Sequence, residues 1–243
     1  MDISSSERVF KRIKNEKIVA TVVIDDLKVV MPLAETLYEA GIVCIELTLR
    51  TDCALQAIQQ IADKLPHVLV GAGTVLTPSQ LIAVQDAGGN FAVSPGIDPL
   101  VLEKALAIKL PFSPGVMTPS DIQLALNYNY KNLKFFPAEP SGGITYLKAM
   151  AAPYKHTGIG FVPLGGLNEG NFLDYLNEDL VVAVGGSWLA PRAKIAARDW
   201  SGISSCARHC RSLIDALAGS VSSRKKADKD IISTNNNIQS ENL

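Results

Sequence analysis

Eight short apolar runs recur along the chain, and amphipathic stretches separate them from start to finish. The runs cover residues 18–24, 43–49, 68–73, 90–94, 112–116, 133–136, 160–164 and 181–184. Continuous apolar strands separated by helices are typical of parallel strands that are buried on both faces. Eight such units in about 250 residues predict an α/β fold of the (β/α)8 barrel type, and a doubly wound open sheet is the alternative.

The stretches between the runs predict helices, for example over residues 27–40, 52–65, 78–87 and 119–128. Thr77-Pro78 and Thr118-Pro119 each place a capping residue before a proline, which is a common helix start. A further helix is predicted over roughly residues 5–15, before the first strand. We expect this extra N-terminal helix to cover the floor of the barrel.

Composition favours one large domain. The chain has 243 residues, 47% of them hydrophobic, and a formal net charge of −1. That size and composition can bury a single core, which we expect to span residues 1–221. Residues 222–243 are polar and contain too few apolar side chains to offset the entropy of ordering, so they predict a disordered tail.

The same bulk properties argue against several kinds of partner. A near-neutral charge favours neither nucleic acid nor an anionic membrane. No apolar run approaches the ~20 residues of a membrane span, and the N-terminus lacks the apolar segment of a signal peptide. Four cysteines in a chain of this length do not form a disulfide scaffold, so a cytoplasmic protein is expected.

Lys134 stands in the middle of the apolar run Leu133-Lys134-Phe135-Phe136-Pro137. A buried ammonium loses its hydration, so a lysine at such a position needs a partner or a task. Three roles are open: a structural ion pair, a phosphate contact, or a nucleophile that forms a Schiff base. The position within the strand disfavours the phosphate contact, because phosphates bind farther out in the loops. We therefore favour the nucleophile, which remains compatible with an ion pair.

The second run ends in polar residues that alternate with leucines. Strand alternation places Glu46, Thr48 and Arg50 on one face. The functional interpretation assigns proton transfer to Glu46, and to Arg50 the binding of a substrate carboxylate, which a guanidinium fork fits. The structural alternative is a buried Glu–Arg ion pair with no catalytic role.

Glycine-rich turns follow several runs, at the end of the barrel where active sites lie. Thr74 follows Gly71-Ala72-Gly73 and can offer a hydroxyl, although a tight turn would look the same. The Gly165-Gly166 pair and Gly185-Gly186-Ser187 follow the seventh and eighth runs. Phosphate sites in such barrels often form from the backbone N–H groups of these two loops. Glycine pairs are common in turns, so it is their joint position that indicates an anion site.

Histidine is missing from this end of the predicted barrel. His67 and His156 precede strands, and His209 lies in the last helical stretch. A histidine-ligated zinc site and a histidine base are both disfavoured. Cys206, His209 and Cys210 share a helical stretch but lack a fourth ligand, so packing is the preferred interpretation and no metal is expected.

Five motifs carry a resemblance to a known family. They are Ile45-Glu46-Leu47-Thr48-Leu49-Arg50-Thr51, Val70-Gly71-Ala72-Gly73-Thr74-Val75, Val93-Ser94-Pro95-Gly96, Leu133-Lys134-Phe135-Phe136-Pro137-Ala138-Glu139 and Gly185-Gly186-Ser187-Trp188. In this order the motifs resemble the KDPG/KHG aldolases, which act on 2-dehydro-3-deoxy-6-phosphogluconate (KDPG) and 4-hydroxy-2-oxoglutarate (KHG). The similarity covers roughly residues 8–217.

The resemblance implies a class I aldolase of the Entner–Doudoroff type that needs no metal or cofactor and forms a homotrimer. Its small-molecule substrate would be KDPG, cleaved reversibly to pyruvate and glyceraldehyde 3-phosphate. The matched residues are Lys134 (Schiff base), Glu46 (acid/base), Arg50 and Thr74 (pyruvate carboxylate), Pro95 and Phe136 (pyruvyl pocket), and Gly165, Gly166, Gly186 and Ser187 (phosphate).

Two departures from the family pattern bear on the substrate. Leu164 stands where the family commonly has threonine, which removes a hydroxyl and keeps KHG and the galactonate epimer of KDPG open as substrates. Asp25 and Asp26 follow the first run, where some relatives have arginine, and they add negative charge near the rim. Rivals from other classes are a non-catalytic sugar-phosphate binding barrel and a phosphosugar isomerase.

Overall fold

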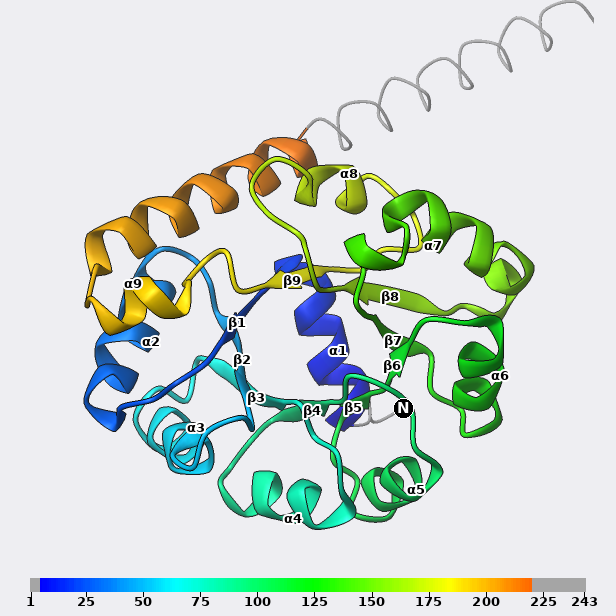
Figure 1. Cartoon of the computed structure of the whole chain (residues 1–243), viewed down its shortest axis with the longest axis horizontal. Coiled ribbons are helices and arrows are strands. Elements are labelled where there is room, and N and C mark those ends of the chain that lie inside the picture. Colours follow the sequence, from blue (N-terminus) through cyan, green and yellow to red (C-terminus); the bar gives the residue numbers. More distant parts are fainter. Residues whose placement is uncertain (1–4, 220–243) are drawn as a thin grey trace, which may run out of the picture.

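The strands run parallel to one another and helices surround them, which is the α/β arrangement that the periodicity predicts (Figure 1). The computed structural model describes residues 5–219. The tail predicted over residues 222–243 lies outside the described residues, as do both ends of the domain predicted over residues 1–221. Between residues 5 and 219, no helix has the length and apolar character needed to cross a membrane.

The strands pair into two sheets. They are β1 (Ile18–Val22), β2 (Cys44–Thr48), β3 (Leu69–Gly73), β4 (Phe91–Val93), β5 (Phe112–Ser113), β6 (Gly115–Val116), β7 (Asn132–Phe135), β8 (Gly160–Pro163) and β9 (Val184–Gly186). One sheet has six strands in the order β5-β4-β3-β2-β1-β9, and the other has three in the order β6-β7-β8. Each predicted run therefore contributes to a sheet.

The sheets are separate where a continuous eight-stranded ladder is expected. Pro114, which has no N–H to donate, interrupts the predicted fifth strand, so β5 pairs with β4 while β6 pairs with β7. The predicted eighth strand is also divided. Val181 forms an isolated parallel bridge with Phe161 of β8, and β9 pairs with β1. The parallel α/β class is confirmed, whereas the hydrogen-bonded ladder is in two parts.

The helices lie between successive strands and at the two ends of the chain. They are α1 (Ser5–Glu16), η1 (Leu27–Val29), α2 (Val30–Glu39), α3 (Ala54–Lys64), α4 (Pro78–Asp86), α5 (Pro99–Ala107), α6 (Pro119–Asn127), η2 (Glu139–Ser141), α7 (Gly143–Ala151), η3 (Ala152–Thr157), α8 (Phe172–Leu176), α9 (Arg192–Ala196) and a helix over residues 200–219. Both Thr-Pro starts are confirmed, because Thr77 and Thr118 each form a capping box at the start of α4 and α6.

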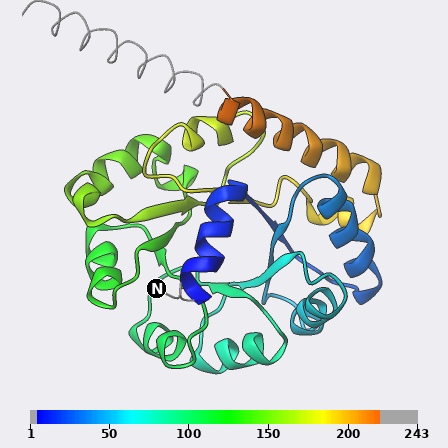
Figure 2. The same ribbon diagram turned by 180° about the vertical axis from the view of Figure 1, so that it is seen from behind.

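Two apolar clusters divide the strand residues by face. Ile45 and Leu47 of β2 belong to the larger cluster, which joins the strands to the surrounding helices. Cys44 of β2 belongs to an inner cluster with strand residues from both sheets. Helix α1 adds Ile13 to that inner cluster and lies across the space that the strands surround (Figure 2). Glu46 and Thr48 alternate with Ile45 and Leu47, so they point to the inner side.

Candidate functional site

A buried lysine and a buried glutamate form the centre of the site. Lys134 on β7 and Glu46 on β2 are only 6% and 2% exposed. The Lys134 Nζ atom donates a hydrogen bond to Glu46 Oε1 at 3.1 Å. These strands belong to different sheets, so the pair bridges the two sheets. The structure therefore brings Lys134 and Glu46 together, and Arg50 is not the partner of Glu46.

Neighbouring residues make room for the carboxylate and orient it. Gly73 of β3 pairs in register with Thr48, and a Cβ atom added at Gly73 would lie 2.0 Å from Glu46 Oε1. Thr21 of β1 lies beside Glu46 in the sheet register, and its hydroxyl donates to Glu46 Oε2 at 3.5 Å. The carboxylate therefore has one oxygen for Lys134 and the other for Thr21.

Aromatic and apolar groups enclose the ammonium of Lys134. The Lys134 Nζ atom lies 5.3 Å from the centre of the Phe136 ring, within the range of a cation–π contact. On the side of α1, a cavity of about 20 Å³ reaches Lys134 and Glu46 and is otherwise lined largely by apolar side chains, including Phe10 and Ile13. Helix α1 thus closes the site at the amino ends of the strands. Access from solvent then comes from the carboxyl ends of the strands.

Strand β2 ends before Arg50, which changes one prediction. The strand stops at Thr48, whose carbonyl accepts a hydrogen bond from the Arg50 N–H at 2.8 Å. Strand alternation therefore does not extend to Arg50, and its side chain is exposed. No residue between 5 and 219 forms an ion pair with Arg50. An exposed, unpaired guanidinium beside the site remains available to an anion.

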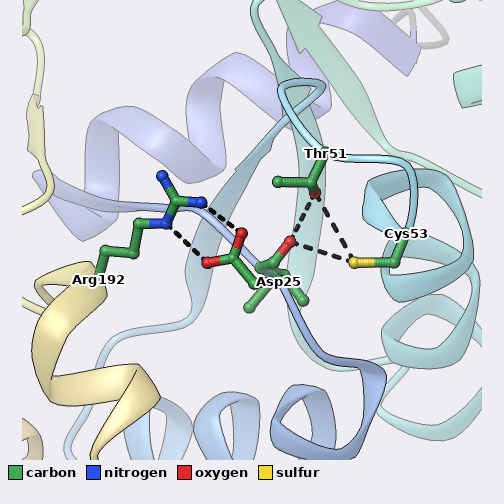
Figure 3. A network of polar contacts seen from close by, with 5 residues as sticks. Asp25, Thr51, Cys53 and Arg192 are labelled. Carbon is green, nitrogen blue, oxygen red and sulfur yellow. Dashed lines mark hydrogen bonds and ion pairs between the residues drawn. The ribbon is translucent and has the colours of Figure 1, made fainter.

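The loop that carries Arg50 is tied to the loop that follows β1 (Figure 3). The Thr51 hydroxyl donates to the carbonyl of Ile24, and the Cys53 thiol donates to the same carbonyl at 3.1 Å. The next residue, Asp25, forms a two-pronged ion pair with Arg192 of α9, with 2.6 Å between Nε and Oδ2. Hydrogen bonding to Arg192 lowers the pKa of the Asp25 carboxyl. The negative charge expected at this rim is therefore locally balanced.

Pro95 and Phe136 line one groove. Its volume is about 370 Å³, and Gly115, Val116 and Met117 contribute to the same walls. Gly115 lies so close to the loop after β4 that an added Cβ atom would be 2.2 Å from the carbonyl oxygen of Pro95. The groove borders Phe136, whose ring also contacts Lys134. The structure thus brings two residues of the predicted pyruvyl pocket together.

The loop after β8 presents unused N–H groups. The carbonyl of Gly165 accepts from the Glu139 N–H at 2.9 Å, and the carbonyl of Gly166 accepts from the side-chain amides of Asn168 and Asn171. Within residues 5–219, the N–H groups of Gly165 and Gly166 donate to no acceptor. The carbonyls of Gly165 and Gly166 are held by hydrogen bonds, which fixes the loop, and the two N–H groups remain free to donate. Such a pair of backbone donors suits the binding of an anion.

Gly186 ends β9 and Ser187 follows it, at the same edge of the strands. Ser187 is exposed, and an added Cβ atom at Gly186 would lie 2.2 Å from the Trp188 ring. Leu164 is 5% exposed and lies against Gly185, where an added Cβ atom would be 2.9 Å from Leu164 Cδ2. Leu164 therefore fills the space between the β8 and β9 ends with an apolar side chain.

Thr74 begins the loop after β3 in a left-handed backbone conformation, with φ of +58°. The loop stays close to the next strand, because the Val75 N–H donates to the carbonyl of Val93. Thr74 follows directly on Gly73, which lies against Glu46. The predicted contact residue is therefore near the central pair, at the same edge as Arg50.

Residues set aside in the sequence stay away from the centre. His67 contacts Tyr38 just before β3 begins, at the opposite end of that strand from Thr74, and the thiol of Cys206 donates to Glu169. Between residues 5 and 219, no cluster of three histidine, cysteine or acidic side chains is arranged to hold a metal ion. Of the three residues in the last helical stretch, Cys210 is buried and Cys206 half-buried, as expected for packing residues, whereas His209 is exposed.

Three polar features of the site were missed by sequence reasoning. The Thr21 hydroxyl contacts Glu46, and it could have been found as the one polar residue of the run Ile18–Val22. The buried Thr48 hydroxyl has no hydrogen-bond partner, which no sequence pattern reveals. Asn168 and Asn171 hold the Gly166 carbonyl from a loop that carried no predicted role.

Known proteins share this arrangement. A family model described as KDPG and KHG aldolase matches residues 9–206. The KHG/KDPG aldolase of Escherichia coli (strain K12) is 41% identical over 191 residues, covering 79% of this chain and 89% of that protein. The 2-dehydro-3-deoxy-phosphogluconate aldolase of Dickeya dadantii is 41% identical over 202 residues, covering 83% and 91%.

A solved structure is similar over most of its length. The KDPG aldolase of Legionella pneumophila, with pyruvate captured as a covalent carbinolamine intermediate, has a TM-score of 0.79 and 36% sequence identity. The similarity covers 85% of this chain and 98% of the Legionella chain. The family model and the fold similarity therefore each extend over most of the molecule.

The packing of Gly73 against Glu46 predicts a large cost for Gly73→Ala. The added methyl group must displace the Glu46 carboxylate and so remove the partner of buried Lys134. Breaking a buried pair costs about 3–5 kcal/mol, so we expect the free energy of unfolding in urea to fall by about 3 kcal/mol. Gly219→Ala is the control, because its added Cβ atom meets no atom of residues 5–219 within 4 Å. Equal stability of the two variants would contradict this account.

Proposed function

Because this chain belongs to the KDPG and KHG aldolase family, we propose that it cleaves KDPG reversibly to pyruvate and glyceraldehyde 3-phosphate. The protein is an aldolase, a carbon–carbon lyase. Pyruvate is held as a covalent carbinolamine in the similar Legionella enzyme, which places the chemistry in class I, where a lysine forms a Schiff base. The proposed reaction is the carbon–carbon cleavage of the Entner–Doudoroff pathway.

The observation that carries this proposal is the buried contact of 3.1 Å between Lys134 and Glu46. A phosphate-binding protein needs neither a buried amine nor a buried carboxylate, so this pair argues against a non-catalytic sugar-phosphate binder. An isomerase needs a base and an electrophile but no covalent imine. The lysine and its neighbouring acid match the requirements of Schiff-base chemistry, namely a nucleophile and a group that can take and return its proton.

In the first half of the proposed mechanism, Lys134 passes a proton to Glu46 and its neutral amine attacks the C2 ketone. The resulting carbinolamine loses its hydroxyl as water, with a proton supplied by Glu46, and a protonated imine forms. Arg50 and Thr74 bind the carboxylate at C1, so that C2 meets the amine in a reactive orientation. Pro95 and Phe136 line the apolar pocket around the pyruvyl carbons.

In the second half, Glu46 takes the proton of the C4 hydroxyl, directly or through a water molecule. The C3–C4 bond breaks, its electron pair moves toward the imine, and the aldehyde leaves. The enamine that remains is protonated at C3 to regenerate the imine. Water then adds to C2, pyruvate departs, and the amine of Lys134 is restored. Proton transfer by a positioned side chain contributes about 10²–10⁴-fold to such steps.

The distal phosphate is assigned to Gly165, Gly166, Gly186 and Ser187. The unused N–H groups of Gly165 and Gly166 support this assignment, because oriented backbone donors bind anions without a positive side chain. The same chemistry on KHG or on the galactonate epimer is the second candidate. The observation that favours it is Leu164, whose apolar side chain offers no hydroxyl to the distal part of the substrate.

We extend the proposal to the architecture and the setting of the enzyme. The two sheets are interpreted as parts of one (β/α)8 barrel, since β9 pairs with β1 and Val181 bridges to β8. Helix α1 would then close its floor. A cytoplasmic location is proposed because the phosphorylated substrate is a metabolite of central metabolism.

A homotrimer is also proposed, as for the family. Apolar side chains are exposed on α4, α5 and the nearby loops, where other copies of the chain would cover them. They are Leu76, Ile82, Leu100, Leu106 and Met117, with exposed fractions from 40% to 64%. Large apolar side chains left exposed on neighbouring helices such as α4 and α5 are a feature of interaction surfaces.

Borohydride reduction in the presence of pyruvate should leave a stable pyruvyl adduct on Lys134, detectable by mass spectrometry of peptides. Lys134→Arg keeps a positive charge beside Glu46 but cannot form an imine, so the adduct should disappear while the fold is retained. Lys131→Arg is the matched control, because Lys131 is exposed just before β7. An adduct that persists in Lys134→Arg would show that another amine is the nucleophile.

Pyruvate release from a panel of substrates tests the choice among KDPG, KHG and the galactonate epimer. We expect the highest kcat/KM for KDPG, because the free N–H groups of Gly165 and Gly166 bind its phosphate. Removal of the phosphate from KDPG should raise KM far more than it lowers kcat. A higher kcat/KM for KHG would contradict the proposed substrate and leave the class I chemistry intact.

Light scattering of the purified protein should give the mass of three chains. Leu100→Glu places a charge on the proposed contact surface, where Leu100 is 64% exposed, and should reduce the mass toward that of one chain. Ala149→Glu is the control, since Ala149 is exposed on α7. A wild-type monomer would contradict the proposed trimer. A trimer that Leu100→Glu leaves intact would contradict the proposed contact surface.

A further inference from the structure

The segment that follows Lys134 continues alongside the loop after β8. The paired strands β7 and β8 end at Phe135 and Pro163, which are opposite each other in the register. Beyond them, the Ala138 N–H donates to the carbonyl of Leu164 at 2.8 Å, and the Glu139 N–H donates to the carbonyl of Gly165 at 2.9 Å. The lysine strand therefore remains hydrogen-bonded to the glycine loop past the end of the sheet.

The glycine loop is shaped by contact with that segment. Gly165 and Gly166 have φ of +93° and +89°, a conformation that favours glycine. A Cβ atom added at Gly166 would lie 2.5 Å from Glu139 Cβ, and one added at Gly165 would lie 3.1 Å from the Phe136 ring. The side chain of Glu139 thus lies directly against the backbone of Gly166.

Tyr175 of α8 holds Glu139 in this position. The Tyr175 hydroxyl donates a hydrogen bond to Glu139 Oε1, and Tyr175 is 1% exposed, whereas Glu139 lies at the surface. Burial, with the hydrogen bond to Glu139, raises the pKa of Tyr175, so the hydroxyl keeps its proton at neutral pH. A hydrogen bond to a carboxylate is among the stronger kinds in proteins. The donor has few alternatives, because its ring is fixed in the core.

We propose that Glu139 and Tyr175 are positioning residues for the distal phosphate: their hydrogen bond holds the Gly165–Gly166 loop so that its two free N–H groups point to the same anion. Neither residue forms or breaks a bond in the reaction. The inference rests on the proposed function, because it takes the ligand of this loop to be the phosphate of the substrate. It predicts that losing the bond weakens recognition of the phosphate and leaves imine formation unchanged.

The test compares KDPG with its unphosphorylated counterpart in four variants. Tyr175→Phe removes only the hydroxyl, and Glu139→Ala removes the carboxylate. We expect each to raise KM for KDPG about tenfold, the equivalent of ~1.4 kcal/mol, with kcat little changed. KM for the unphosphorylated substrate should stay the same. Glu139→Gln keeps an oxygen acceptor for Tyr175 and should largely restore the wild-type KM.

The matched control is Tyr128→Phe, which removes a hydroxyl at the end of α6 that donates to Glu103 of α5 at 3.0 Å. This variant should change neither the KM for KDPG nor the KM for the unphosphorylated substrate. A merely structural role for Tyr175 would alter both substrates equally, and that result overturns the proposal. So does a Glu139→Gln variant as impaired as Glu139→Ala, since the hydrogen bond would then not be what matters.

Binding of inorganic phosphate, measured by calorimetry, separates this inference from the proposed function. If the wild type binds phosphate and Tyr175→Phe weakens that binding, the positioning role holds even where no pyruvyl adduct forms on Lys134. If the wild type forms the adduct and cleaves KDPG but Tyr175→Phe binds phosphate normally, the enzyme assignment stands and the positioning role is wrong. A wild type that binds no phosphate overturns the positioning role.

Discussion

The contact between Lys134 and Glu46 is the constraint on which the rest of the site depends. Each residue carries a charge that is costly to bury alone, so each requires the other in a space that is otherwise apolar. The two residues come from β7 and β2, in different sheets, and their contact requires those sheets to face each other. Gly73 is part of the same constraint, because any side chain there would occupy the place of the Glu46 carboxylate.

The two ends of the strands around this pair differ in polarity: one end is apolar, and the other carries groups that can bind anions. The floor is closed by apolar residues of α1, so solvent and substrate meet Lys134 from the other side. At that side the exposed guanidinium of Arg50 and the free N–H groups of Gly165 and Gly166 are available to anions. A substrate with a carboxylate at one end and a phosphate at the other matches that distribution of donors.

The sequence predicted the strands well because their apolar residues are continuous, and it singled out Lys134 and Glu46 because both interrupt such runs, without predicting that they pair with each other. It did not predict the end of β2 at Thr48, since the turn that exposes Arg50 depends on a backbone hydrogen bond and not on residue type. It also missed the division of the fifth strand, where one proline, Pro114, lies inside an otherwise regular run.

Contacts between distant residues explain most of what the sequence could not reveal. Tyr175 and Glu139 are 36 residues apart, and neither interrupts a periodic pattern. The same holds for the ion pair of Asp25 and Arg192, which changes the meaning of the acidic residues after β1. In the sequence, without its partner, Asp25 adds a negative charge at the rim that would repel an anionic substrate. Paired with Arg192, it instead ties the loop after β1 to α9, and its charge is balanced by the guanidinium.

The segment from Lys134 to Glu139 links the chemical and the recognition parts of the site. Lys134 is the proposed nucleophile, Phe136 lies against both the ammonium and Gly165, and Glu139 lies against Gly166. The distance between the covalent centre and the anion donors is therefore set by one stretch of backbone that is hydrogen-bonded to the loop after β8. In the proposed reaction, this spacing favours substrates whose ketone and phosphate are the same distance apart as Lys134 and the glycine loop. In the proposed reaction, KHG lacks the phosphate that the free N–H groups are proposed to bind, so its binding would draw on only part of the available contacts.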